Sequence, residues 1–211
     1  MNPTIYLARC NPSKTAQLEL LAAKLHPMVQ LRISKVKSTE AQNQIILGRA
    51  LLSLALIRLG AAGATLTEIG ALRSGAPDLP NGFVGSIAHT DGLVAATAAN
   101  GQFKIGIDIE HSWLSCRCPT ADFCPAESPD TPSEACIRRW TISEALAKAS
   151  GRSLSDVIKN SRPKKLSKGY SVRAISLSDG YYLSVASSVP FRNISFINVE
   201  IAQLLDAFQL S

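Results

Sequence analysis

The segment FVGSIAHTDGLVAATAANGQFKIGIDIE, residues 83–110, contains three short apolar runs. The runs are Phe83 to His89, Leu93 to Ala99 and Gln102 to Glu110, and Asp-Gly and Asn-Gly pairs stand between them. Such pairs between apolar runs are typical of β-hairpins. The segment therefore predicts three adjacent antiparallel strands in a meander.

Helical patterns flank these strands. Ser38 to Leu59 precedes them, with Ser38 as the N-cap and Gly60 in the position after the helix that glycine favours. Ser133 to Ser150 follows them and ends at Gly151. Weaker patterns predict a helix at Ser13 to Leu25, strands at Tyr170 to Ser176, Tyr181 to Ser187 and Phe196 to Val199, and a short terminal helix.

Helices and then strands occur in each half of the chain, which predicts an α+β fold of two similar halves. Each half would pack a long helix on a small antiparallel sheet. The expected boundary lies near residues 100–104, so that residues 1–103 form the N-terminal half and residues 104–211 the C-terminal half.

The composition limits the possible partners and compartments. The chain has 211 residues, a formal net charge of +6 and a pI near 9.2, which favour an acidic protein or a polyanionic ligand. Five cysteines and no recognisable signal peptide favour a reducing cytoplasm. The most apolar stretch, Ile45 to Ala64, carries two arginines, so we expect no membrane span.

Two carboxylates share a face of the third predicted strand. Side chains alternate along a strand, so Asp108 and Glu110 point one way while Ile107 and Ile109 point into the core. Adjacent carboxylates repel each other unless a positive group lies between them, and Mg²⁺ prefers oxygen ligands. Gly106, just before the two carboxylates, would let a ligand approach the backbone. The alternative interpretation is that Asp108 and Glu110 lie on a solvated strand edge.

A second group lies on the helix at 133–150, where Trp140, Glu144 and Lys148 are spaced four residues apart and share a face. Glu144 could be a third metal carboxylate and Lys148 a phosphate ligand; the alternative is a surface Glu–Lys pair. His89, at a strand end, could contact an anion or be structural.

These pieces stand in a fixed order in the chain. They are Ile87-Ala88-His89-Thr90, Gly106-Ile107-Asp108-Ile109-Glu110 and Trp140-x-x-x-Glu144-Ala145-x-x-Lys148-Ala149-x-Gly151, with Pro77-Asp78-Leu79-Pro80 and Phe123-Cys124-Pro125-Ala126-Glu127 between or before them. From Gln44 to Ser187 the chain resembles the 4′-phosphopantetheinyl transferase superfamily, in its longer single-chain, surfactin-synthetase-activating type. That type is built as a pseudo-dimer and acts as a monomer.

The resemblance implies a magnesium-dependent enzyme that moves the phosphopantetheine arm of coenzyme A to a serine of an acidic apo carrier protein. The implied Mg²⁺ ligands, in the C-terminal half, are Asp108, Glu110 and Glu144. The implied catalytic residues are Glu144, Lys148, His89 and Asp108. The implied coenzyme A contacts are Ala88, His89, Asp108 and Lys148.

Three positions depart from the family pattern, because Ser143, Ala76 and Gln44 stand where basic residues usually bind coenzyme A phosphates. A basic residue elsewhere, such as Arg49, could compensate. Otherwise the chain would be a weak or inactive relative that binds coenzyme A or carrier protein without transfer.

Two further alternatives stay open. Cys116, Cys118 and Cys124, with Cys136 or His111, could form a zinc site, although their spacing is unusual for one. The basic segment from Arg162 to Lys168 could bind nucleic acid, although few aromatic residues and no binding motif accompany it. We expect it to be a solvated loop or a docking patch for an acidic carrier.

Overall fold

The structure is a computed structural model that describes residues 2–61, 65–72, 76–112, 134–159 and 169–210. The chain divides into two compact units. The N-terminal unit comprises Asn2–Phe103 and Arg192–Ser211, and the central unit comprises Lys104–Phe191. Both units contain helices and a sheet, so the predicted mixed α+β class is confirmed.

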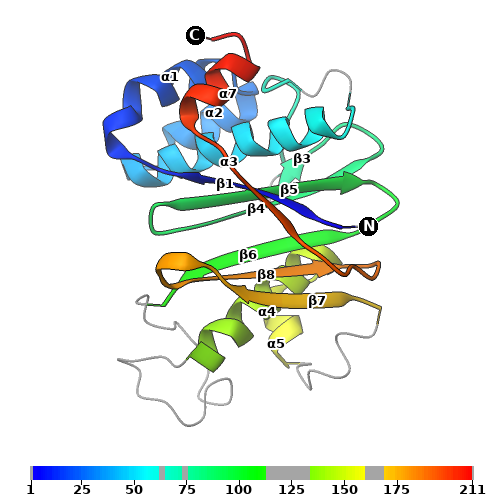
Figure 1. The fold of residues 1–211 in the computed structure, drawn as a ribbon. Helices are drawn as coiled ribbons and strands as arrows, with labels where there is room; N and C mark the ends of the chain where they lie inside the picture. Colours follow the sequence, from blue (N-terminus) through cyan, green and yellow to red (C-terminus); the bar gives the residue numbers. More distant parts are fainter. Residues whose placement is uncertain (1, 62–64, 73–75, 113–133, 160–168, 211) are drawn as a thin grey trace. The chain divides into compact units, whose positions relative to one another are not determined.

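The N-terminal unit is built on a sheet with the strand order β4-β5-β1-β9. Strand β1 is antiparallel to β5 and parallel to β9. Helix α3 packs against β5, β4 and β1 (Figure 1). Its elements are β1 (Thr4–Arg9), η1 (Pro12–Lys14), α1 (Thr15–Ala23), α2 (Pro27–Ser34), α3 (Thr39–Arg58), β2 (Gly70–Ala71), β3 (Pro77–Asp78), β4 (Phe83–Thr90), β5 (Leu93–Asn100), β9 (Ser195–Asn198) and α7 (Ile201–Ala207).

Both ends of α3 lie where the sequence predicted them. The Ser38 side chain accepts a hydrogen bond from the backbone N–H of Ala41 at 3.3 Å, which caps the first turn. Gly60 follows the helix with φ +80°, and the N–H of Ala61 donates to the Leu56 carbonyl at 3.1 Å. This closing bond belongs to the Schellman motif, which ends a helix at a left-handed residue.

The central unit is built on an antiparallel sheet with the order β6-β8-β7, and α4 and α5 lie on one face of it (Figure 1). Its elements are β6 (Ile105–His111), α4 (Glu134–Ser150), α5 (Leu154–Lys159), β7 (Ser171–Ser176), η2 (Ser178–Gly180) and β8 (Tyr181–Ser187). Both units run from a strand through a long helix to a hairpin, and the second hairpin strand pairs with the first strand of the unit. The two units therefore share one topology.

The predicted three-strand meander is wrong. Strand β6 lies in a different sheet from β4 and β5 and pairs instead with β8. After β5, the N–H of Gly101 donates to the Gly82 carbonyl at 2.6 Å, so the Asn100-Gly101 turn folds back toward the start of β4. The turn signal was present, but a turn residue does not determine which strand comes next in the sheet.

Two further expectations about the N-terminal half need correction. Its sheet is mixed rather than antiparallel, because β9 joins β1 in parallel. The sequence analysis also expected the half to begin with helices and did not predict α2 or β1, the strand with which the unit begins. Residues 192–211, which we had placed in the C-terminal half, pack with the N-terminal unit through β9 and α7.

The other expected elements lie close to their predicted bounds, from α1 through β7, β8, β9 and α7. The irregular segment Cys116 to Pro132 and the N-cap Ser133 lie outside the described residues. Among the helices that the structure describes, none is long and apolar enough to cross a membrane.

Helix α4 approaches β6 so closely that Gly106 has no room for a side chain. A Cβ atom at Gly106 would clash with the backbone oxygen of Ala145 and lie 2.5 Å from the backbone nitrogen of Ala149. We had expected Gly106 to let a ligand approach; in the structure it lets a helix approach. In the N-terminal unit, a Cβ at Gly48 of α3 would lie 2.7 Å from Ile87 Cγ2 of β4.

We predict that Gly106→Ala destabilises the protein by about 3 kcal/mol, at the upper end of overpacking costs, because backbone atoms cannot move aside as side chains can. Urea unfolding followed by circular dichroism measures the change. Gly60→Ala is the matched control, because a Cβ at Gly60 meets nothing within 4 Å and only its positive φ is strained. The control should cost about 1 kcal/mol. Equal losses in the two variants would contradict the packing role of Gly106.

Candidate functional site

The site is built on the face of β6 that meets α4. Gly106 and Asp108 both contact α4 residues, and Glu110 shares their face by strand alternation. Ile107 and Ile109 point to the opposite face and are fully buried, as predicted. The strand therefore presents its two carboxylates toward the helix rather than to open solvent.

The buried carboxylate of Asp108 forms an ion pair with the partly exposed side chain of Lys148. The Lys148 Nζ lies 2.7 Å from Asp108 Oδ1, and the side chains are 32% and 9% exposed. The second carboxylate oxygen, Asp108 Oδ2, is buried and has no hydrogen-bond partner. An ionised oxygen that is buried without a hydrogen-bond partner raises the free energy of the folded state. Such a group can be satisfied by a bound ligand.

The electrostatic surroundings of Asp108 bring in the two other expected carboxylates. Burial is the main cause that raises the pKa of Asp108 to about 7. The Lys148 ammonium opposes this rise in pKa, and the negative charges of Glu110 and Glu144 add to it. Glu110 and Glu144, both half-buried, are therefore near enough to act on Asp108.

The donor chemistry of this cluster fits a hard divalent cation, because carboxylate oxygens predominate and one of them is buried without a partner. However, within the described ranges no three His, Cys, Asp or Glu side chains are gathered closely enough to hold a metal ion. The positive group that meets Asp108 in the structure is the ammonium of Lys148.

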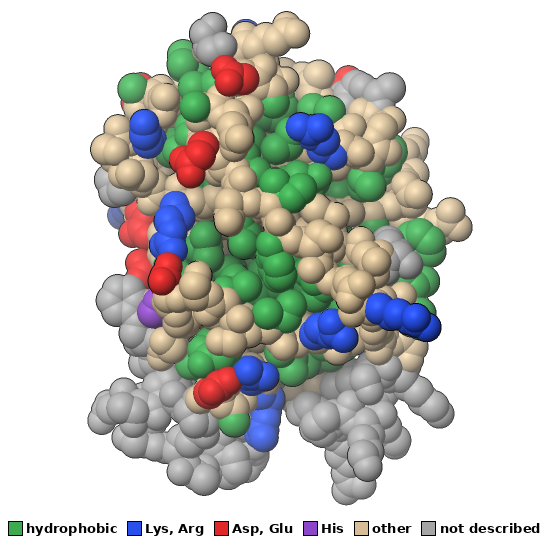
Figure 2. All heavy atoms as spheres, viewed as in Figure 1, with side chains coloured by type: hydrophobic (Ala, Val, Ile, Leu, Met, Phe, Trp, Pro, Cys, Tyr) green, Lys and Arg blue, Asp and Glu red, His purple; other side chains and the backbone are tan. Residues whose placement is uncertain are grey.

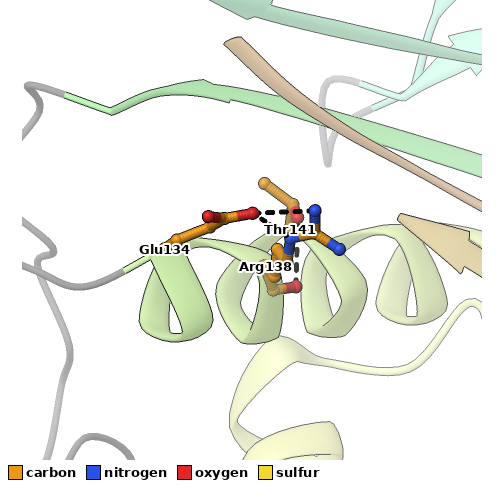
Figure 3. A network of polar contacts seen from close by, with 3 residues as sticks. All are labelled: Glu134, Arg138 and Thr141. Atoms are coloured by element: carbon orange, nitrogen blue, oxygen red, sulfur yellow. Dashed lines mark hydrogen bonds and ion pairs between the residues drawn. The ribbon is translucent and has the colours of Figure 1, made fainter. Parts of the chain in front are cut away.

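Contacts along α4 fix how the helix lies on the sheet. Thr141 Oγ1 lies 2.8 Å from Ser184 Oγ of β8, and Ser184 is the residue paired with Asp108 across the two strands. One turn earlier, Arg138 forms an ion pair with Glu134 at 2.8 Å, and its backbone oxygen accepts a hydrogen bond from Thr141 (Figure 3). Thr141 and Ser184 were not predicted, because finding them requires the β6–β8 register.

The remaining expected residues lie in the N-terminal unit. Ala88 is buried in β4, and the side chain of the next residue, His89, is exposed. The structure thus brings Asp108 and Lys148 into contact in the central unit, which also carries Glu110 and Glu144, while Ala88 and His89 lie in the other unit.

Residues 38–99 match the family model described as the 4′-phosphopantetheinyl transferase N-terminal domain. The matched segment runs from the start of α3 almost to the end of β5 and includes Ala88 and His89. No curated protein matches the chain. The match supports the resemblance to the 4′-phosphopantetheinyl transferase superfamily through the N-terminal unit, whereas the acidic cluster lies outside the matched residues.

The structure gives local reasons for two departures from that family's pattern. Ser143 is buried, and its hydroxyl donates to the Arg139 carbonyl at 2.9 Å, so this position faces the interior. Gln44 is also buried, beside Glu40. A lysine or an arginine there would have to leave the interior to reach a phosphate.

Arg49, which we considered as a substitute phosphate ligand, is also buried. Its Nη1 donates to the Gly70 carbonyl at 2.9 Å, which ties α3 to β2. Burial lowers the pKa of Arg49 to about 10, and the nearby charge of Arg32 contributes. These contacts indicate a structural role for Arg49.

The zinc alternative gains no support from the described residues. His111 stacks edge-on against Tyr181, with ring centroids 4.5 Å apart. Cys136 is disulfide-bonded, so its sulfur is not a free thiolate. The remaining loop cysteines of this proposal lie outside the described residues.

Nucleic-acid binding also gains no support. On the face shown in Figure 2, Lys and Arg side chains are interspersed with Asp and Glu rather than gathered into a stripe. The basic segment Arg162 to Lys168, on which the alternative rested, lies outside the described residues.

We predict that the protein loses stability as the pH rises from about 4 to about 7 in metal-free buffer. In the folded state Asp108 keeps its proton up to about pH 7. An unfolded aspartate releases its proton near pH 4. Between these values the folded state binds the extra proton, so stability falls with rising pH. Urea unfolding at pH 5 and pH 8 measures this, and Asp108→Asn should flatten the difference.

Asp206→Asn is the control, because Asp206 is an exposed aspartate in α7. It should retain the wild-type pH dependence. If Asp108→Asn shows the same pH dependence as wild type, the assignment to Asp108 is wrong.

Proposed function

We propose that the protein is a 4′-phosphopantetheinyl transferase that moves the arm of coenzyme A to a serine hydroxyl of an apo carrier protein. The observation that carries the proposal is the family match over residues 38–99. The carboxylate of Asp108 and its neighbours Glu110 and Glu144 support it, because carboxylates could hold the divalent cation that neutralises a diphosphate.

The residues that would hold Mg²⁺ are Asp108, Glu110 and Glu144. The buried oxygen of Asp108 that has no partner supports the assignment of Asp108, and the assignments of Glu110 and Glu144 rest on the resemblance. When bound, the ion would supply charge neutralisation at the diphosphate of coenzyme A.

The transfer itself forms one phosphorus–oxygen bond and breaks another. The serine oxygen of the carrier attacks the β-phosphorus of coenzyme A, the bond from that phosphorus to the bridging oxygen breaks, and adenosine 3′,5′-bisphosphate leaves. Glu144, or a water that it orients, accepts the hydroxyl proton. Lys148 would neutralise charge on the diphosphate, and His89 with the backbone of Ala88 would contact the phosphates.

The pseudo-dimer arrangement is part of this proposal. Its support is that each unit runs strand, long helix and hairpin, and that apart from β9 the strands of the two sheets follow the same order.

The second candidate function is a relative that binds coenzyme A or carrier protein without transfer. The buried positions of Ser143 and Gln44 favour it, because both residues replace basic phosphate ligands of the family. Each lost charged hydrogen bond costs about 1.5–3 kcal/mol of binding.

We predict that purified protein, incubated with coenzyme A, Mg²⁺ and an apo carrier protein, adds one phosphopantetheine arm to the carrier. Intact-mass spectrometry of the carrier measures the product. Asp108→Ala should lower the rate by about 100-fold or more, because it removes one of the carboxylates that would hold Mg²⁺ against the diphosphate.

Asp206→Ala is the matched control and should keep the wild-type rate, because Asp206 is exposed on α7. An unmodified carrier, with coenzyme A binding still measurable by calorimetry, would favour the non-catalytic relative. An Asp108→Ala rate equal to wild type would refute the role of the acidic cluster.

A further inference from the structure

Strand β9 forms an open edge of the N-terminal sheet. It stands last in the order β4-β5-β1-β9, and among the strands that the structure describes only β1 pairs with it. All four of its residues, Ser195 to Asn198, are exposed. Such an edge offers backbone N–H and C=O groups to a further strand.

The side chains of β9 do not guard this edge. Natural edge strands are commonly protected by charged residues, by proline or by a bulge. The strand reads Ser-Phe-Ile-Asn, without a charge or a proline. Phe196 and Ile197 are 38% and 43% exposed, and they lie on opposite faces because side chains alternate along a strand. An apolar edge that is exposed on both faces favours pairing with another chain.

The hydrogen bonds to β1 show which backbone groups of β9 face outward. The N–H groups of Ser195 and Val199 donate to backbone carbonyls in and beside β1, at 3.0 and 2.8 Å. The backbone groups of successive strand residues point to alternate sides of the strand. Those of Phe196 and Asn198 therefore point away from β1, toward the open edge.

We propose that β9 pairs with β9 of a second copy of this chain, antiparallel and about a two-fold axis at Phe196. In this register Phe196 exchanges backbone hydrogen bonds with its own counterpart, and Ile194 exchanges them with Asn198 of the second copy. The outward backbone groups thus meet one another, as an antiparallel ladder requires. The same surface serves both copies, which is the form of a two-fold interface, and the two sheets become one continuous sheet.

The charges beside β9 select this register. Arg192 and Glu200 are the charged residues of the segment 190–201, and one stands on each side of β9. Centring the pair on Phe196 places Arg192 of each copy opposite Glu200 of the other, and centring it on any other residue of β9 does not. Opposite charges across paired strands attract. The inference does not depend on the proposed function, and it replaces the monomer that the resemblance implied.

Sedimentation velocity of the full chain tests the dimer, at concentrations from about 1 to 200 μM, the range in which small interfaces dissociate. A short strand pair buries little area, so we expect a dissociation constant on the order of 20 μM. Phe196→Lys places two ammonium groups against each other at the axis and should weaken dimerisation by about tenfold or more.

Met28→Lys is the matched control for Phe196→Lys. Met28 is a 53% exposed apolar residue of α2, and its substitution adds the same charge. It should keep the wild-type dissociation constant. A wild-type protein that stays monomeric at the highest concentration refutes the pairing, and so does a Phe196→Lys variant that dimerises as the wild type does.

Disulfide trapping tests the register. In the pair centred on Phe196, Ser195 lies opposite Ile197 of the second copy at a non-hydrogen-bonded position, where a Cα separation of about 4.5 Å suits a disulfide. Oxidation of a mixture of Ser195→Cys and Ile197→Cys should therefore give a cross-linked heterodimer, identified by peptide mapping of the 195–197 disulfide. Ser195→Cys oxidised alone is the control and should give no 195–195 disulfide. A 195–195 disulfide, or a mixture without the 195–197 disulfide, overturns the register.

Discussion

Asp108 is almost completely buried, so its charge needs a counter-charge from the protein. The ammonium of Lys148 supplies it, and Lys148 belongs to α4, the helix that covers Asp108. The absence of a side chain at Gly106 allows α4 to lie against β6 backbone to backbone. The same close approach brings Lys148 within 2.7 Å of Asp108. The contact that holds the central unit together and the electrostatics of the candidate site thus depend on one helix–strand interface.

The N-terminal unit shows that this topology alone does not make such a site. Its first strand, Thr4–Arg9, carries no carboxylate, and the buried charge on its long helix is the cation Arg49. That guanidinium donates a hydrogen bond to the backbone carbonyl of Gly70. The order of strand, long helix and hairpin therefore occurs in both units. The acidic side chains of the candidate site are carried by the first strand of the central unit alone.

Local patterns predicted the elements well wherever the cause of the structure is local. The cap at Ser38, the stop at Gly60 and the alternation of Asp108 with buried isoleucines could all be read from neighbouring residues. The pairing of strands could not be read in this way, because the residues that pair between β6 and β8 lie 70 to 82 positions apart in the chain. For the same reason the sequence indicated that Asp108 and Lys148 matter, but not that they bind each other or that Ser184 lies opposite them.

The parallel pairing of β9 with β1 makes the N-terminal unit discontinuous along the chain. During synthesis, β1 emerges from the ribosome long before β9, and the whole central unit is made in between. At about 5–20 residues per second, the interval lasts about 10 to 40 seconds. Throughout it, the edge of β1 that pairs with β9 has no strand beside it, so the strand of this sheet that emerges first is among the last to gain both of its neighbours.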